Sequence, residues 1–114
     1  MDINPTTQPP VDGVARLLDA TRARLIAVGW KRGGIAAPRK DQPACLYWSL
    51  RFCAGLVADE TPSDVVCDAR RRLIDGLPMK SRHYGLTAWN DAQGRTVEHV
   101  VALIDAVRAN LVTS

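Results

Sequence analysis

The spacing of apolar residues near the C-terminus constrains this fold more than any other feature of the sequence. From residue 97 to residue 111 they recur three or four positions apart, at Val97, Val100, Val101, Ile104, Val107 and Leu111. That spacing predicts a helix of about four turns with one apolar stripe. Thr96 precedes the helix and is expected to be its N-cap. The rest of the chain must therefore supply elements that bury this stripe.

The residues before this helix predict a polar loop. Asn90, Asp91 and Gly94 are types that form tight turns, through side-chain bonds to the backbone or through tolerance of positive φ. The loop from Trp89 to Thr96 is suited to the top of a binding site. It is equally suited to a helix cap over a buried tryptophan, and the sequence does not decide between these two roles.

Two further helices are expected in the first half of the chain. Residues 12–28 follow a helical period, and Gly29 is expected to be a left-handed C-terminal cap, with Trp30 packing back on the last turn. Residues 41–58 are apolar nearly all round and predict a central helix with Pro43 in its first turn. The small residues Cys45, Ser49 and Cys53 lie four apart and would let a neighbouring helix approach closely.

A fourth helix is expected between residues 61 and 75. Thr61 is the expected N-cap, and Pro62 is expected at the first helical position. Its inner face would carry Val65, Val66, Ala69, Leu73 and Ile74, while Asp68 and the arginines that follow point mostly outward. Gly76 is expected to cap the helix, and Leu77 to tuck back. Residues 78–88 are expected to form an irregular link.

These elements predict an all-α fold, a compact bundle of about four helices. We expect one helical domain at 12–114 after a disordered tail at 1–11, because prolines and polar residues dominate the tail. No alternating segment predicts a confident strand, although a minor two-stranded element around residues 35–36 and 84–86 is left open. No apolar run approaches the roughly 20 residues of a membrane span, and the three cysteines and absent signal peptide favour the cytoplasm.

The residues that could support catalysis or metal binding do not form a convincing set. Cys45 and Cys53 would be about 12 Å apart along one helix, whereas two thiolates on one zinc ion must lie within about 4 Å. His99 stands near the start of the last helix, where Asp91 could orient it, but no nucleophile is placed beside it by sequence. We expect no catalytic residues, no metal and no cofactor, and lean against an enzyme.

Two groups of residues remain as candidates for binding. The arginines at 70–72 would spread over some 200° of a helix and form a broad positive surface, for which a solvated face is the simpler interpretation. The loop supplies the polar and aromatic types that contact ligands. The candidate binding residues are therefore Trp89, Asn90, Asp91, Arg95, His99, Arg70, Arg71 and Arg72.

The C-terminal third also resembles a known family. Residues 86–91 (Leu-Thr-Ala-Trp-Asn-Asp), Gly94-Arg95-Thr96 and residues 100–106 resemble the C-terminal signature of a small all-helical family, the domain of unknown function 6197. The first helix ending in Gly29-Trp30 agrees more loosely, so the resemblance covers about residues 12–111. It implies a helical fold in a bacterial or phage setting, specifically actinobacteria and their phages, and it implies no reaction.

We therefore expect a small cytoplasmic accessory protein that acts by binding a macromolecular partner, in the first place a protein. Arginine and exposed aromatic side chains are the types that anchor such interfaces. Self-association into a homo-oligomer is a related expectation, because the second helix offers much apolar surface. One alternative is weak, sequence-tolerant binding of nucleic acid through dispersed Arg and Lys. The other is a small-ligand or enzymatic site between Trp89 and His99.

Overall fold

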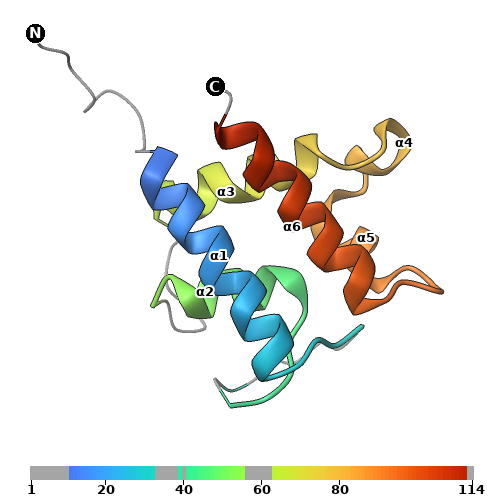
Figure 1. Cartoon of the computed structure of the whole chain (residues 1–114). Helices are drawn as coiled ribbons and strands as arrows, with labels where there is room; N and C mark the ends of the chain where they lie inside the picture. Colours follow the sequence, from blue (N-terminus) through green and yellow to red (C-terminus); the bar gives the residue numbers. More distant parts are fainter. Residues whose placement is uncertain (1–10, 33–38, 40, 56–62, 113–114) are drawn as a thin grey trace, which may run out of the picture.

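The computed structural model describes residues 11–32, 39, 41–55 and 63–112, and their regular structure is entirely helical. The expected tail, Thr61, Pro62 and residues 35–36 lie outside these ranges. The all-α class is confirmed, but the described residues form six helices rather than about four, because the link expected at 78–88 contains two short ones. The helices are α1 (Val11–Ala27), α2 (Leu46–Cys53), α3 (Asp64–Asp75), α4 (Met79–Arg82), α5 (Gly85–Asp91) and α6 (Val97–Val112) (Figure 1).

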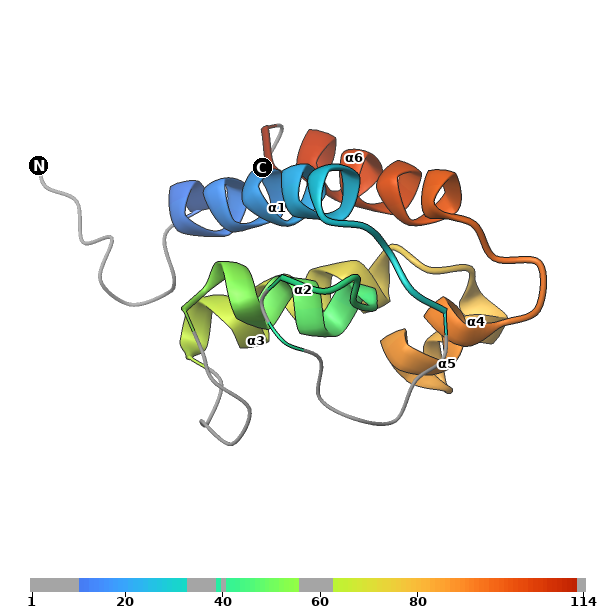
Figure 2. The same cartoon turned by 90° about the horizontal axis from the view of Figure 1, so that it is seen from below.

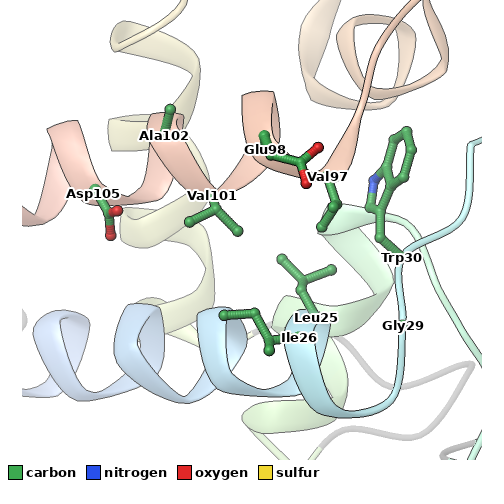
Figure 3. Close-up of a pocket in the computed structure, with 9 residues that line it drawn as sticks. All are labelled: Leu25, Ile26, Gly29, Trp30, Val97, Glu98, Val101, Ala102 and Asp105. Atoms are coloured by element: carbon green, nitrogen blue, oxygen red, sulfur yellow. The ribbon is translucent and has the colours of Figure 1, made fainter.

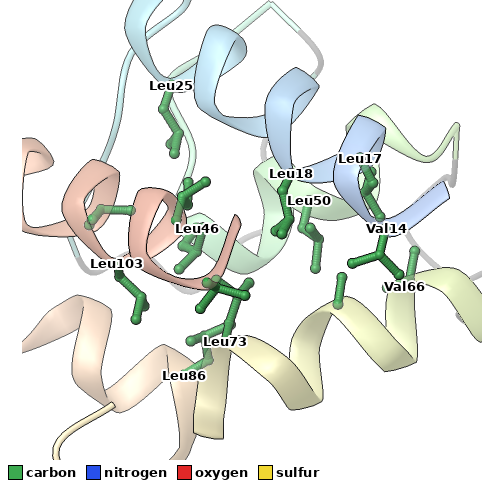
Figure 4. Close-up of a cluster of buried hydrophobic side chains, with 14 of the residues drawn as sticks. Val14, Leu17, Leu18, Leu25, Leu46, Leu50, Val66, Leu73, Leu86 and Leu103 are labelled. Carbon is green, nitrogen blue, oxygen red and sulfur yellow. The ribbon is translucent and has the colours of Figure 1, made fainter. Parts of the chain in front are cut away.

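The helices form two layers. In Figure 2, α1 and α6 lie side by side, and α2, α3, α4 and α5 all lie on one side of that pair. Ion pairs show that α1 and α6 are antiparallel, because Arg22 pairs with Asp105 at 2.9 Å while Asp19 pairs with Arg108 at 3.1 Å. The hydrophobic core fills the space between the layers (Figure 4). The other side of the α1/α6 layer carries no further element among the described residues.

The expectations for α1 and α6 are confirmed. Four residues of the α6 stripe are buried: Val100, Ile104, Val107 and Leu111. Gly29 follows α1 with a φ of 122°, a left-handed conformation that L side chains rarely adopt, and Trp30 packs against the core. Both helices are long and strongly periodic, so their stripes were sufficient to predict them.

The helix expected at 41–58 begins later, at Leu46, and its described part ends at Cys53. The residues before it are extended instead, because Lys31 donates its N–H to the carbonyl of Ala44 at 3.2 Å and Ala44 donates to Gly29 at 3.4 Å. This parallel bridge between Trp30 and Ala44 replaces the strand pairing that was left open, since residues 85–86 belong to α5. The Sγ of Cys45 then caps α2 by accepting the N–H of Trp48.

The small-residue seam of α2 does face α1. Ser49 is fully buried, and its hydroxyl accepts a hydrogen bond at 3.2 Å from Arg24 of α1. Cys53 is partly buried and packs against the core. The close approach predicted for this side of the helix is therefore confirmed at Ser49.

The predicted inner face of α3 is confirmed, but its two ends and one side chain differ from expectation. Ser63 is the N-cap, and its hydroxyl accepts the N–H of Val66 at 3.4 Å. Asp68 is only 6% exposed rather than outward. Gly76 has a right-handed φ of −80°, so it is no left-handed cap. A Cβ there would lie 2.9 Å from a methyl of Val107, which explains the glycine by close packing of α3 against α6.

Candidate functional site

Asn90 is the most highly connected polar side chain among the candidate residues. It is fully buried in α5, and its Oδ1 accepts hydrogen bonds from the indole Nε1–H of Trp30 at 2.7 Å and from the N–H of Leu46 at 3.0 Å. Its Nδ2 donates to the carbonyl of Lys31 at 3.2 Å and to Oδ1 of Asp91 at 2.9 Å. An amide side chain offers two donor and two acceptor positions, so its capacity is fully used. Asn90 thereby joins the chain after α1, the start of α2 and the end of α5.

The loop expected from Trp89 to Thr96 is shorter in the structure than predicted. Trp89, Asn90 and Asp91 are the last residues of α5, and the turn begins at Ala92, with Gly94 at a φ of 83°. The prediction that Asn90 and Asp91 form a tight turn is wrong, because tertiary hydrogen bonds to Asn90 outweigh its local turn preference. Trp89 is 8% exposed and therefore buried.

Arg95 closes this turn against α5. Its guanidinium lies 4.0 Å from the centre of the Trp89 ring, and its Nε donates at 2.9 Å to the Trp89 carbonyl. The contact combines a cation–π interaction with satisfaction of a carbonyl at the helix end. Arg95 therefore fixes the path of the chain into α6.

His99 takes part in the cap of α6. Its backbone N–H donates to the Thr96 hydroxyl at 3.4 Å, and its ring Nδ1 accepts the Thr96 N–H at 3.1 Å. This reciprocal arrangement is a capping box with histidine in place of the usual acidic or amide residue, and it confirms Thr96 as the N-cap. The ring occupies the exposed first turn of α6.

A groove runs between the C-terminal part of α1 and the N-terminal part of α6 (Figure 3). Its volume is about 710 Å³. The walls are mostly apolar and come from Leu25, Ile26, Gly29, Trp30, Val97, Glu98, Val101, Ala102 and Asp105. Trp30 stands at one end of the groove, beside Val97. Because Asn90 holds the indole of Trp30, the candidate residues of α5 position one wall of this groove.

Two carboxylates lie on the groove and differ in their surroundings. Asp105 pairs with Arg22 across the two helices. Glu98 is exposed, and no described residue makes a hydrogen bond or ion pair with its carboxylate. The groove therefore combines apolar walls with one uncompensated negative charge.

Sequence reasoning did not identify the groove. Its one local signal is Ile26, which falls outside the buried stripe of α1 and is 61% exposed. Large apolar side chains off the stripe of an amphipathic helix are worth noting for this reason. The opposing residues of α6 are about 70 positions away in the chain, so only folding brings the walls together.

The arginines at 70–72 lie on α3, in the other layer. Arg71 and Arg72 both hydrogen-bond to the buried carboxylate of Asp68, Arg72 through Nε at 3.0 Å. Burial alone would raise the pKa of Asp68, but the hydrogen bonds and charges of Arg72 and Arg71 outweigh it and hold the pKa below its ordinary value. Arg70 is exposed and lies 5.9 Å from the centre of the Tyr47 ring. Two of the three arginines are therefore engaged locally.

The aromatic side of α2 is covered by arginines. Arg24 lies 4.8 Å from the centre of the Phe52 ring, and Arg51 lies 5.3 Å from that of Trp48 and 5.6 Å from that of Tyr47. These contacts cover part of the apolar surface on which the expectation of self-association rested, and the three aromatic side chains remain half-buried.

The three thiols are dispersed in the structure. Burial raises the pKa of Cys45 and of Cys53, and Cys67 is exposed on α3. Within the described ranges, no three His, Cys, Asp or Glu side chains gather as metal ligands would. No helix of that part of the chain is long and apolar enough to cross a membrane.

Comparison with known proteins identifies the family. The model of a family described as "Family of unknown function (DUF6197)" matches residues 9–110, so the chain belongs to that family. The match covers α1 to most of α6, including the Asn90 contacts and both walls of the groove. No curated protein and no solved structure matches the chain.

Proposed function

We propose that this member of the DUF6197 family is a small accessory protein that binds another protein chain through the groove between α1 and α6. The observation that carries the proposal is the groove itself, which has a volume of about 710 Å³, mostly apolar walls and Ile26 exposed at its edge. Contiguous exposed apolar surface with a polar rim is typical of interaction sites. We place this role in the cytoplasm of a bacterium or of a phage-infected cell, in keeping with the sequence signature.

The chemistry of the groove defines what the bound segment must offer. The side chains of Leu25, Ile26 and Val101 require an apolar or aliphatic contact. Glu98, which has no described partner, favours a cation at the same place. A long basic side chain meets both requirements, because its aliphatic stem packs on apolar surface while its charged end reaches a carboxylate. The position of Trp30, fixed by Asn90, keeps this surface preformed.

The two alternatives have less support. A small-ligand site around Asn90 would need free hydrogen-bonding groups there, whereas the Asn90 amide is fully used within the protein. Nucleic-acid binding would need free cations on one face, and Arg71 and Arg72 are already paired with Asp68. Binding of a partner protein in the groove requires neither a free Asn90 amide nor unpaired arginines.

The test compares two variants that each add one charge at an exposed apolar residue. Ile26→Glu alters the groove, and Met79→Glu alters an exposed residue of α4 outside the groove; the two residues are 61% and 77% exposed, respectively. Tagged proteins are used to capture partners from nuclease-treated host lysate, with quantification by mass spectrometry. We expect the wild type and Met79→Glu to retain the same specific protein and Ile26→Glu to lose it. Equal capture by all three would refute the groove, and loss of every partner on nuclease treatment would favour nucleic acid.

A further inference from the structure

The side of the α1/α6 layer that faces away from the core is unusually apolar for an exposed helical surface. We call it the outer face and define it by exposed residues of both helices, most of which on a helical period lie opposite the buried stripes: Asp12, Arg16, Asp19, Ala20, Ala23, Ile26 and Ala27 of α1, and Glu98, Ala102, Asp105, Ala106 and Ala109 of α6. Figure 2 shows that all the other helices lie on the opposite side of this layer. The groove opens on the outer face at the end that carries Glu98.

Arg16 and Glu98 place opposite charges at the two ends of the outer face. Arg16 lies in the first turns of α1 and Glu98 in the first turn of α6, and the two helices are antiparallel. Because Asp19 is level with Arg108, Arg16 is level with the last turn of α6, about 20 Å along the helix axis from Glu98. Neither the Arg16 nor the Glu98 side chain has a hydrogen-bond or ion-pair partner among the described residues. The two charges thus cannot compensate one another within one molecule.

We propose that the outer face binds the outer face of a second copy of this chain, with Arg16 of each copy lying in the groove of the other and pairing with its Glu98. This inference rests on the proposed role of the groove and names its occupant. A twofold axis that lies in the plane of the interface and crosses both helices near their midpoints exchanges the two ends of the face. The Arg16–Glu98 contact is therefore formed twice, as an isologous interface requires.

The groove has the shape and chemistry that Arg16 needs. The three-carbon stem of an arginine would pack on the apolar walls formed by Ile26 and Val101, and its guanidinium would reach the carboxylate of Glu98. Between the two ends of the face, the exposed side chains are mostly alanines, which allow two helix layers to approach closely. The remaining charges are the exposed Asp12, one turn before Arg16 on α1, and the Arg22–Asp105 and Asp19–Arg108 pairs, which are already neutral within each copy.

The size of the face predicts a weak dimer. The 17 residues of α1 span about 25 Å, and two packed helices are about 20 Å wide, so each copy contributes roughly 500 Å² in projection. The two copies together would bury about 1,000 Å² or slightly more, at the lower end of specific interfaces. We therefore expect a dissociation constant in the micromolar range and a population that changes with concentration.

The experiment is sedimentation velocity at concentrations from about 10 to about 500 μM, a range that spans micromolar dissociation constants. Wild-type protein should shift from monomer to dimer over this range. Arg16→Glu and Glu98→Arg should each weaken the dimer at least about tenfold, because each places like charges together at both contacts. Lys80→Glu makes the same change of charge at an exposed residue of α4 and should leave the dimer unchanged. Circular dichroism verifies that every variant is folded.

Mixing the two charge variants gives the decisive result. Each variant alone opposes like charges, but an equimolar mixture pairs Glu at 16 with Arg at 98 and Arg16 with Glu98, so the mixture should form dimers with near wild-type affinity. A monomeric wild type, single variants that dimerise normally, or a mixture that stays monomeric would each overturn the proposal. If the wild type is monomeric and Ile26→Glu loses the captured partner, the groove binds a different protein and not a second copy of this chain. Monomeric wild type with equal capture by Ile26→Glu would refute both proposals.

Discussion

Replacing Asn90 with alanine should destabilise the protein far more than an average substitution. The amide of Asn90 accepts two hydrogen bonds and donates two, and the side chain is fully buried. Alanine would leave the N–H of Leu46 and the indole N–H of Trp30 without their acceptor. Leu46 is itself fully buried, so its N–H has no access to water as a replacement.

The expected loss follows from these two donors. An unsatisfied buried donor costs about 1–3 kcal/mol. The Leu46 N–H should contribute near the upper end of that range and the partly exposed Trp30 near the lower end. The carbonyl of Lys31 adds little, because Lys31 is exposed and water can replace the amide. The sum is about 3–4 kcal/mol, a large part of the 5–15 kcal/mol that typically stabilises a domain.

Urea unfolding followed by circular dichroism measures this loss as a change in the free energy of unfolding. In thermal unfolding, the same loss should lower Tm by about 12–16 °C for a chain of this length. Thr87→Ala on the exposed side of α5 is the matched control and should change stability by less than about 0.5 kcal/mol. Trp30→Phe removes a single donor and should cost less than Asn90→Ala.

A double-mutant cycle of Trp30→Phe and Asn90→Ala then isolates their interaction, for which we expect a coupling of about 1 kcal/mol. A loss below about 1 kcal/mol for Asn90→Ala would refute this account of the side chain. Asn90 would then be available for a ligand, and this result would favour the hypothesis of a small-ligand site between Trp89 and His99.

Three further predictions concern packing, ionisation and thiol reactivity. Gly76→Ala should destabilise the protein by about 1–3 kcal/mol in urea unfolding, because its Cβ would lie 2.9 Å from a valine methyl of α6; an unchanged midpoint would contradict this. The lowered pKa of Asp68 stabilises the fold above the unfolded-state pKa of about 3.9, and that contribution disappears as pH falls through the folded pKa. Wild-type stability should therefore fall more steeply than that of Asp68→Asn below about pH 4, and parallel pH profiles would exclude this role. Because burial raises the pKa of Cys45 and Cys53, one thiol of the native protein should react fast with a disulfide reagent at pH 8, and Cys67→Ser should remove that fast phase; three equal rates would be inconsistent with the structure.

The parts of the fold that could be predicted from the sequence are those with strong local signals. The long stripes of α1 and α6 recur over four or more turns, and Gly29 and Thr96 mark ends that the structure confirms. The short helices α4 and α5 have no comparable stripe. They occupy a segment whose polar composition resembles that of a loop, and tertiary contacts decide their conformation.

The candidate site shows a different limit. Asn90 is a predicted binding residue, and its sequence neighbours indicate a turn, whereas its hydrogen-bond partners Trp30 and Leu46 are 60 and 44 residues away. A side chain that joins three segments leaves no local pattern in any one of them. The length of α2 was overestimated for the same reason, because pairing between residues 29–31 and Ala44 keeps the preceding residues extended despite their apolar character.

The hydrogen bonds of Asn90 support one wall of the groove. Asn90 holds the indole of Trp30, and Trp30 forms the end wall of the groove beside Val97. Arg95 and the Thr96 cap fix the turn that places Val97 opposite that indole. The residues that most resemble a binding motif in the sequence therefore act from behind the binding surface, as supports that keep it preformed. Loss of Asn90 should for this reason weaken stability and partner binding together, whereas Ile26→Glu should weaken binding alone.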